Sequence, residues 1–314
     1  MVTNHPLFSL VLGGLIIAST GCRSVPEHTT VAPLLTVGSD YKPPVFTEPN
    51  RESKILKAIP LADSIVKDFM RQEHLPGVAG GIVLNGKLIH SFYYGYTDLS
   101  KNTAVDSLSD FRIASMTKSF TAMAILKLRD EGKLDLDDPA SKYIPEMDSL
   151  RYLSRDARPI NIRDLLTHRA GFPEDNPYGD RQLGDTEDDL LNMIKESPAF
   201  SNVPGISYEY SNLGFALLGE IIKRVSGLTY QQYITENIFR PLGMTHSYFD
   251  YTKVPAEQLA HGYRWINESW RDEALEKDGS WGAMGGLITT IEDFSRYVAF
   301  HLSAWPPRSD EETG

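Results

Sequence analysis

The chain has 314 residues, 41% of them hydrophobic and 23% charged, which is enough for one large domain or two smaller ones with a substantial core. Its formal net charge is −11 and it has no basic tract, so it is a poor candidate for nucleic-acid binding. With a single cysteine it can form no intramolecular disulfide, and no apolar run is long enough to span a bilayer.

The N-terminus has the order of segments found in an export signal. The apolar run LFSLVLGGLIIASTGC passes into small residues and ends at Cys22. This resembles a bacterial lipoprotein signal, which is cleaved before a cysteine that becomes lipidated. A plain secretory signal or a fortuitous apolar N-terminus is the alternative, because MVTNHP contains no Lys or Arg. We expect a signal peptide over 1–22 and a protein that is exported to the cell envelope, lipid-anchored in a bacterial membrane and facing the periplasm or the cell surface.

Residues 23–54 are rich in Pro, Thr, Ser and charge, which predicts a flexible tether, and the folded domain is expected over 55–314. Leu61, Ile65 and Phe69 recur every four residues, the period of an amphipathic helix that packs through this side and exposes the opposite one, which carries Ser64 and Lys67. The helix is expected to end at the following Pro-Gly pair.

A β-hairpin is predicted next. The segments VAGGIVL and KLIHSFYYG flank Asn85-Gly86, and Asn-Gly tolerates positive φ at both central positions of a type I′ turn. A short strand is expected at Asp110–Ile113. From Thr117 to Arg129 apolar residues cover most of the helical circumference, which is typical of a central, buried helix.

A long helical section is predicted over about 130–275. Its helices are expected in NIRDLLTHRAG, near 186–196, in NLGFALLGEIIKRVSG and in TYQQYITENIF. A last helix is expected in TTIEDFSRYVAFHL, with Ile291, Phe294, Val298 and Leu302 on one face. Two hairpin strands and one short strand make a thin sheet for so many helices, so further strands are expected on the C-terminal side.

Ser115 is the candidate nucleophile, with Lys118 as its base. Ser-x-x-Lys is a weak motif, since it also occurs at Ser39 and Ser64, but only Ser115 lies where a strand ends and a buried helix begins. There its own N–H could stabilise an oxyanion, and Lys118, one turn on, returns to the same face. Burial and the helix dipole disfavour a charged lysine, so Lys118 could take the serine proton. The alternative is a helix-capping serine with a snorkelling lysine.

The segment YEYSN supplies a second candidate pair, Tyr210 and Asn212, in a loop just before a helix. A tyrosine hydroxyl near a cationic lysine can relay protons, and an asparagine amide can hold a substrate amide. The alternative is that Asn212 caps the helix and Tyr210 only packs.

Competing chemistries have little support in the sequence. There is no Gly-x-Ser-x-Gly, so a nucleophile elbow of the α/β-hydrolase type is not indicated. The eight histidines show no His-x-His or His-Glu-x-x-His spacing, which argues against a zinc site. No phosphate loop of the Walker type is present.

Taken together, these segments resemble the serine β-lactamase and penicillin-binding-protein superfamily. The likeness is to its class C-like branch, which includes class C β-lactamases, D,D-peptidases, D-aminopeptidases and serine esterases. The matching segments occur in the family's order from about residue 60 to 302. They are LPGVAGGIVLNGKLI, FRIASMTKSFTAMAILKLRDEGKLDLDDP, INIRDLLTHRAGFP, PGISYEYSNLGFALLGEIIKRVSGLTYQQYITENIFRPLGMTHS and GAMGGLITTIEDFSRYVAFHL.

The resemblance implies an α+β fold, with a mixed, mainly antiparallel sheet flanked by helices and a helical subdomain. It implies that Ser115 is acylated, with Lys118 as its proton partner. Tyr210 would be the general base in acylation and would activate water in deacylation, and Asn212 would position the substrate amide or carbonyl. The implied activity is hydrolysis of an amide, a β-lactam or an ester through an acyl-enzyme, on a small-molecule or peptide substrate, with no metal or organic cofactor.

One departure from the family pattern concerns its third motif, Lys- or His-x-Gly on a sheet strand that lines the site. Lys277-Asp278-Gly279 and His261-Gly262 look similar, but we expect neither to lead into a strand. The motif is therefore expected beyond Gly314, in a chain that lacks the last sheet strands and the terminal helix. Loss of one oxyanion donor costs roughly 10²–10³ in rate, so we expect this form to be unstable or nearly inactive. The alternative function is a non-catalytic sensor that binds a cell-wall peptide or a β-lactam on the same fold.

Overall fold

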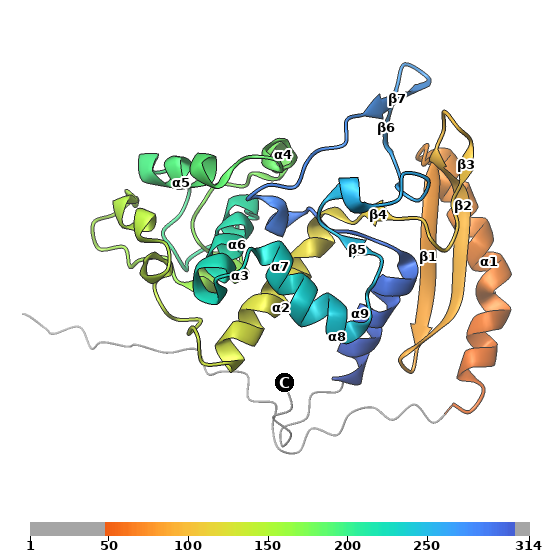
Figure 1. The fold of residues 1–314 in the computed structure, drawn as a ribbon, viewed down its shortest axis with the longest axis horizontal. Coiled ribbons are helices and arrows are strands. Elements are labelled where there is room, and N and C mark those ends of the chain that lie inside the picture. Colours follow the sequence, from red (N-terminus) through yellow and green to blue (C-terminus); the bar gives the residue numbers. More distant parts are fainter. Residues whose placement is uncertain (1–47, 305–314) are drawn as a thin grey trace, which may run out of the picture. The chain divides into compact units, whose positions relative to one another are not determined.

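The computed structural model describes residues 48–304 (Figure 1). Cys22, the signal peptide over 1–22 and most of the expected tether lie outside the described residues and stay predictions. Within the described range, no helix combines the length and the apolar character that crossing a membrane requires.

The described chain begins with a helix and an antiparallel sheet. Helix α1 covers Arg51–Gln72, so it begins before the domain start expected at Ile55. Strands β1 (Gly77–Leu84) and β2 (Lys87–Asp98) pair antiparallel, and β3 (Thr103–Ala104) extends the sheet in the order β1-β2-β3. Asn85 and Gly86 have φ of 51° and 74°, which confirms the predicted hairpin turn.

Helix α1 packs through a different face from the one the sequence indicated. Leu61, Ile65 and Phe69 are 67%, 60% and 53% exposed. Val66 and Met70 are instead among its partly buried residues. The helix lies against β1 and β2 (Figure 1). Both apolar stripes have helical spacing, so periodicity alone could not choose between them. The prediction that the first stripe is the packing face is wrong within the described residues.

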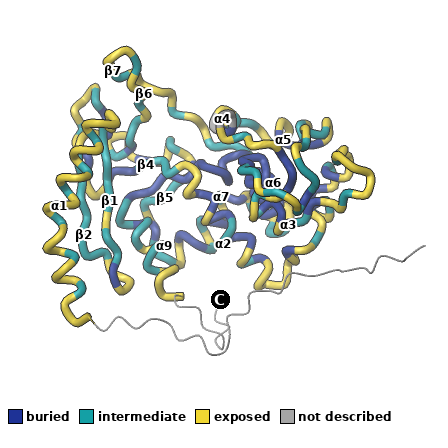
Figure 2. The backbone as a smooth tube through the Cα atoms, turned by 180° about the vertical axis from the view of Figure 1, so that it is seen from behind, coloured by how far each residue is buried: buried dark blue, intermediate teal, exposed yellow. Residues whose placement is uncertain are grey.

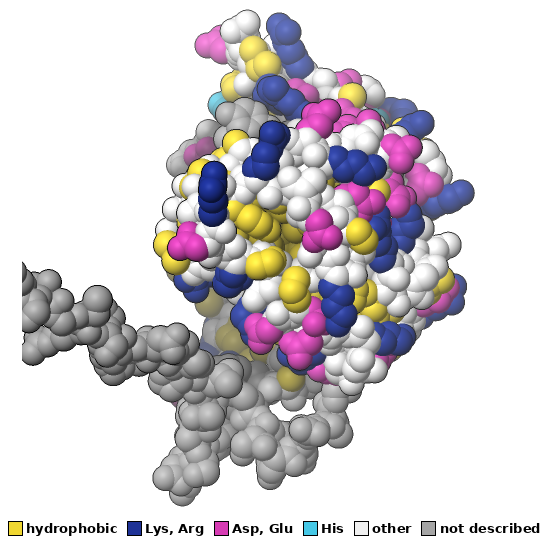
Figure 3. Space-filling model, turned by 90° about the vertical axis from the view of Figure 1, so that its left-hand side faces the viewer, with side chains coloured by type: hydrophobic (Ala, Val, Ile, Leu, Met, Phe, Trp, Pro, Cys, Tyr) yellow, Lys and Arg dark blue, Asp and Glu magenta, His cyan; other side chains and the backbone are white. Residues whose placement is uncertain are grey.

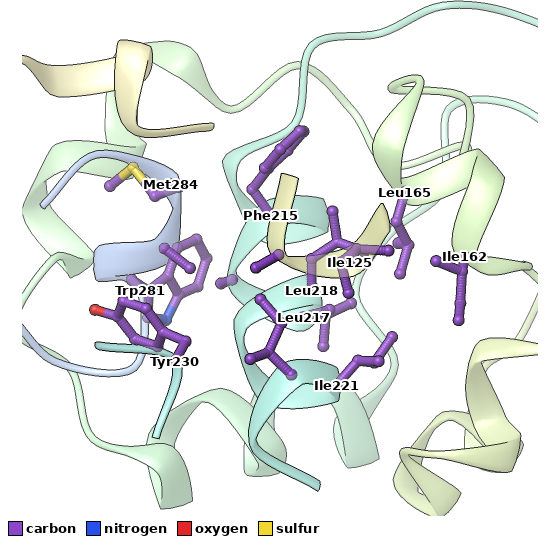
Figure 4. Packing of buried hydrophobic residues seen from close by; sticks show 14 of the residues in the cluster. Ile125, Ile162, Leu165, Phe215, Leu217, Leu218, Ile221, Tyr230, Trp281 and Met284 are labelled. Atoms are coloured by element: carbon purple, nitrogen blue, oxygen red, sulfur yellow. The ribbon is translucent and has the colours of Figure 1, made fainter. Parts of the chain in front are cut away.

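The core lies between two helices that were both predicted. Helix α2 spans Thr117–Asp130, and α6 spans Asn212–Ser226 and ends at Gly227, whose φ is 76°. Residues 212–222 of α6 are all buried (Figure 2). Figure 4 shows why: on one side α6 meets Trp281, Met284 and Tyr230, and on the other side the short helix that carries Ile162 and Leu165.

The remaining helices surround this pair. They are α3 (Ile162–Leu166), α4 (Asn176–Gly179), α5 (Glu187–Glu196), α7 (Tyr230–Ile234), α8 (Arg240–Leu242) and α9 (Ile291–Ser303). A π-helical turn joins α7 to α8. On the face of the helical part drawn in Figure 3, lysines and arginines are interspersed with acidic side chains, and no continuous basic stripe appears.

The helical section was expected to reach about residue 275, but it ends at α8, and strands β5, β6, β7 and β8 follow it along the chain. Strands β4 (Phe111–Arg112), β8 (Ile288–Thr289) and β5 (Ser247–Tyr248) form a small antiparallel sheet in that order. Strands β6 (Gly262–Ile266) and β7 (Ser269–Glu273) form a projecting hairpin (Figure 1). The sequence indicated the two hairpin strands and one short strand before Ser115, and it did not locate β3, β5, β6, β7 or β8 within this chain. Two-residue strands give no alternating pattern to recognise.

Helix α9 joins the hairpin sheet to the core. It contacts β1 and β2 on the face opposite α1 (Figure 1). On its other side Tyr297 stacks on Phe120 of α2, with ring centroids 3.8 Å apart. Of the residues expected on its apolar face, Ile291, Phe294 and Val298 are partly buried, but Leu302 is 42% exposed.

Asp110, just before β4, is a buried carboxylate without a hydrogen-bond partner among the described residues. Its backbone is tied to Gln258 and Ala260, but its side chain is 0% exposed and neither carboxylate oxygen is bonded. Burial, and then the nearby carboxylate of Asp293, raise the pKa of Asp110 to about 7. Asp110 thus introduces a buried, unpaired acid into the segment that leads to Ser115.

Asp110→Asn should stabilise the protein at neutral and alkaline pH only. The folded protein keeps the Asp110 proton up to about pH 7, whereas an unfolded chain releases it near about pH 4, so wild-type stability falls as pH rises between these values. We expect a gain in unfolding free energy of roughly 1–3 kcal/mol at about pH 8 and little at about pH 5, measured by urea unfolding. Asp188→Asn, at an exposed position, is the control. An equal gain at both pH values would contradict the explanation.

Candidate active site

Ser115 lies in a tight turn between β4 and α2. Residues Ala114–Met116 form one turn of 3-10 helix, and the Ser115 side chain is exposed. Its backbone N–H makes no hydrogen bond within the described part of the chain, so it is available to a ligand. A free N–H beside an exposed hydroxyl at the start of a helix is the arrangement that an acyl oxyanion requires.

Lys118 lies beneath Ser115 and is 7% exposed. Its Nζ donates hydrogen bonds to Ser115 Oγ at 3.1 Å, to Asn212 Oδ1 at 2.7 Å and to the Met284 carbonyl at 2.7 Å. An ammonium group has three protons to donate, and these three acceptors match that number. The site therefore compensates a buried cation with three oxygen atoms from separate parts of the chain.

Tyr210 reaches Ser115 from the other side. Its hydroxyl donates to Ser115 Oγ at 2.7 Å, and its ring centroid lies 4.9 Å from Lys118 Nζ. The structure thus brings together all four residues that the sequence singled out: Ser115, Lys118, Tyr210 and Asn212.

The capping alternatives do not describe this geometry. No side chain caps the N-terminus of α2, and Lys118 is buried rather than extended to solvent. Helix α6 is capped by Ser211, whose Oγ accepts from the Gly214 N–H at 3.0 Å, which leaves the Asn212 side chain for Lys118.

The loop that carries Tyr210 is fixed by Asp175, which sequence reasoning missed. The Asp175 carboxylate accepts from the N–H groups of Asn212 at 2.6 Å and Leu213 at 2.8 Å, in the first turn of α6. The Asp175 N–H in turn donates to the Tyr210 carbonyl at 3.4 Å. A carboxylate at a helix N-terminus is favoured by the helix dipole. Asp175 thus holds the start of α6 through its side chain and the backbone of Tyr210 through its N–H.

The turn at Gly282–Met284 packs against α2 and α6, and its role was also missed. Besides the bond from Lys118 to Met284, Thr121 Oγ1 donates to the Ala283 carbonyl at 2.7 Å. Asp278 anchors this segment, because its Oδ2 accepts from the Tyr230 hydroxyl at 2.5 Å. Burial raises the pKa of Asp278 to about 6. The glycine-rich stretch GAMGG was the only local signal.

The two look-alikes of the third motif behave differently. Lys277-Asp278-Gly279 lies in an irregular segment, as expected. His261-Gly262 does lead into a strand, because β6 begins at Gly262, so that part of the prediction is wrong. Strand β6 pairs only with β7 among the described strands. Between residues 48 and 304, no three His, Cys, Asp or Glu side chains are grouped so as to hold a metal ion.

Comparison with known proteins gives a family match over most of the chain. The family model described as Beta-lactamase matches residues 62–312. Protein flp of Staphylococcus aureus (strain NCTC 8325 / PS 47) is 32% identical over 249 residues, which is 78% of this chain and 49% of the relative. Beta-lactamase-like protein 2 of Dictyostelium discoideum is 33% identical over 281 residues, 87% of this chain and 51% of the relative. The chain spans about half the length of these curated relatives.

Solved structures give the same grouping. The octameric penicillin-binding protein homologue from Pyrococcus abyssi has a TM-score of 0.68 at 29% identity, over 78% of this chain and 56% of that one. A class C beta lactamase has a TM-score of 0.65 at 28% identity, over 81% of this chain and 66% of that one. EstCE1, a hydrolase with promiscuous acyltransferase activity, has a TM-score of 0.67 over 79% and 72%, and at 20% identity it shows the fold alone.

Ala114, the residue before Ser115, has a φ of 46°. This left-handed backbone conformation is energetically unfavourable for any residue that has a Cβ atom. Ala114→Val should lose about 1–3 kcal/mol of unfolding free energy, because a β-branched residue fits this conformation poorly, whereas Ala114→Gly should be neutral or stabilising. Urea unfolding measures both. Ala62→Val, exposed on α1, is the matched control and should cost less than about 0.7 kcal/mol. Equal losses at the two positions would show that Ala114 is not strained.

Proposed function

The chain belongs to the beta-lactamase family, and we propose that it is a serine hydrolase that works through an acyl-enzyme on Ser115. The family match and the related structures confirm the predicted superfamily and the α+β fold. The observation that carries the proposal is that Ser115 Oγ accepts hydrogen bonds from both Lys118 Nζ and the Tyr210 hydroxyl. Because the chain spans about half of its curated relatives, the activity of a whole protein is part of the same proposal.

In acylation, Tyr210 as the phenolate takes the Ser115 proton across the 2.7 Å contact. Oγ then bonds to the acyl carbon, and the oxyanion accepts from the free Ser115 N–H. Lys118 supplies the positive charge that balances the phenolate. When the tetrahedral intermediate collapses, the bond to the leaving group breaks and the leaving group receives the proton from Tyr210.

Deacylation reverses these steps with water. Water gives a proton to Tyr210 and bonds to the acyl carbon, and Ser115 Oγ leaves and recovers that proton. The sequence assigned Asn212 to the substrate, but its side chain is 2% exposed and bound to Lys118. We therefore assign Asn212 to holding the lysine.

The acyl substrate is an ester, an amide or a β-lactam, because all three present a carbonyl carbon to the same Ser-Lys-Tyr set. Activated esters are the least demanding, since their leaving group departs without a strong acid. They are therefore the substrates to test first, with nitrocefin beside them.

A fluorophosphonate probe tests the nucleophile directly. Ser115 Oγ should displace fluoride, forming an O–P bond, and the intact mass should rise by one phosphonyl group. Ser115→Ala should abolish both this adduct and the turnover of a p-nitrophenyl ester. Ser64→Ala, in the second Ser-x-x-Lys on the exposed side of α1, should change neither. An adduct on Ser115 without any turnover would favour the binding-protein alternative, and no adduct would refute the nucleophile.

Tyr210→Phe tests the general base, because it removes the hydroxyl and keeps the aromatic ring. Removing the hydroxyl alone should slow ester turnover by about 10²–10⁴-fold, the usual contribution of a general base. Tyr208→Phe, two residues away and 64% exposed, is the matched control and should leave the rate unchanged. A Tyr210→Phe variant with wild-type rate would transfer the base role to Lys118.

A further inference from the structure

His168 is a half-buried residue that the sequence did not single out, and it lies two residues after the end of α3. Its φ of 56° is unusual for a residue with a side chain. Such backbone strain is kept where the surrounding structure fixes it, so the contacts of this residue matter.

His168 contacts Tyr210 and both of its chain neighbours. The His168 carbonyl accepts from the Glu209 N–H at 2.9 Å. Its Nδ1 accepts from the Ser211 N–H at 3.0 Å. Its ring stacks on the ring of Tyr210, with centroids 4.6 Å apart and planes 25° from parallel. His168 therefore holds the backbone on both sides of Tyr210 by hydrogen bonds and packs against the phenol ring that lies between them.

We propose that His168 is a positioning residue for Tyr210, holding the phenol hydroxyl against Ser115, and that it does so as the neutral imidazole with its proton on Nε2. The proposal rests on the proposed function, in which Tyr210 moves the Ser115 proton. His168 itself touches neither Ser115 nor the acyl group.

The hydrogen bond from Ser211 sets the tautomer. An Nδ1 that accepts from a backbone N–H must carry a lone pair, so the ring proton lies on Nε2. A second proton would occupy Nδ1 and break this bond.

The groups around the ring agree with a neutral imidazole. Burial, and then the charge of Lys118 on α2, lower the pKa of His168, while Asp175 opposes them. Tyr208 and Phe215 are the other two rings that pack against it. We therefore expect the hydrogen bond from the Ser211 N–H to His168 to persist at neutral pH and to be lost only in acid, below the ordinary pKa of histidine.

Two substitutions separate the two kinds of contact. His168→Phe keeps a stacking ring and loses the acceptor, and His168→Asn keeps an acceptor and loses the ring. Each should slow phosphonylation of Ser115 by about 10- to 100-fold, the effect of a misplaced catalytic group. His74→Phe, at an exposed histidine, is the control and should leave the rate unchanged.

A double-mutant cycle distinguishes positioning from general support of the fold. In a Tyr210→Phe background, His168→Phe should slow the reaction less than about twofold, because the group that it positions is already gone. An equal loss in both backgrounds would overturn the proposal. The acid limb of the rate against pH should also change in His168→Phe and not in His74→Phe; an unchanged limb would likewise count against it.

Nitrogen NMR of histidine-labelled protein gives a readout that does not need a reactive serine. His168 should show the Nε2–H tautomer and a pKa below that of an exposed histidine. The Nδ1–H tautomer, or an ordinary titration, would overturn the proposal even if Ser115 reacts. If wild-type Ser115 does not react at all, the proposed function fails, and the tautomer alone decides whether His168 holds Tyr210.

Discussion

The buried ammonium of Lys118 is the constraint on which the site depends. An ammonium group taken out of water needs an acceptor for each of its protons, and a missing one costs about 1–3 kcal/mol or more. Its three acceptors belong to the serine turn, to α6 and to the Gly282–Met284 turn. Segments up to 166 residues apart must therefore meet at one nitrogen atom. The same bonds that satisfy the lysine place Ser115 and Asn212.

The core makes this meeting possible. Helices α2 and α6 pack against each other, and the turn at Gly282–Met284 packs against both (Figure 4). The approach is close because α6 has a glycine there: a Cβ on Gly219 would lie 2.7 Å from Ala283 Cβ. A helix that is apolar on nearly every side can pack against neighbours on every side. One neighbour of α6 is the Gly282–Met284 turn, and this packing fixes the Met284 carbonyl that accepts from Lys118.

Sequence reasoning could find the parts of the site that are local. Ser115 and Lys118 are one helical turn apart where a strand passes into a buried helix, and Tyr210 and Asn212 lie at the start of a strongly patterned helix. Spacing together with local context therefore makes each pair visible. Asp175, His168 and Met284 act across long sequence separations, through a carboxylate, a ring nitrogen and a backbone carbonyl that no spacing reveals. The packing face of α1 was also beyond reach, because the choice between its two apolar stripes is made by the sheet.

The hydrogen bonds at Ser115 also say what must change before the serine can react. Oγ accepts from Lys118 and from Tyr210, so its own proton points toward neither of them. For Tyr210 to act as base, this 2.7 Å bond must reverse, which requires the tyrosine to ionise first. Of the lysine and the histidine beside its ring, Lys118 can balance that charge as an ammonium group. His168 must stay neutral, because a protonated ring would lose its hydrogen bond from the Ser211 N–H. One partner of Tyr210 thus contributes by being charged, and the other by staying neutral.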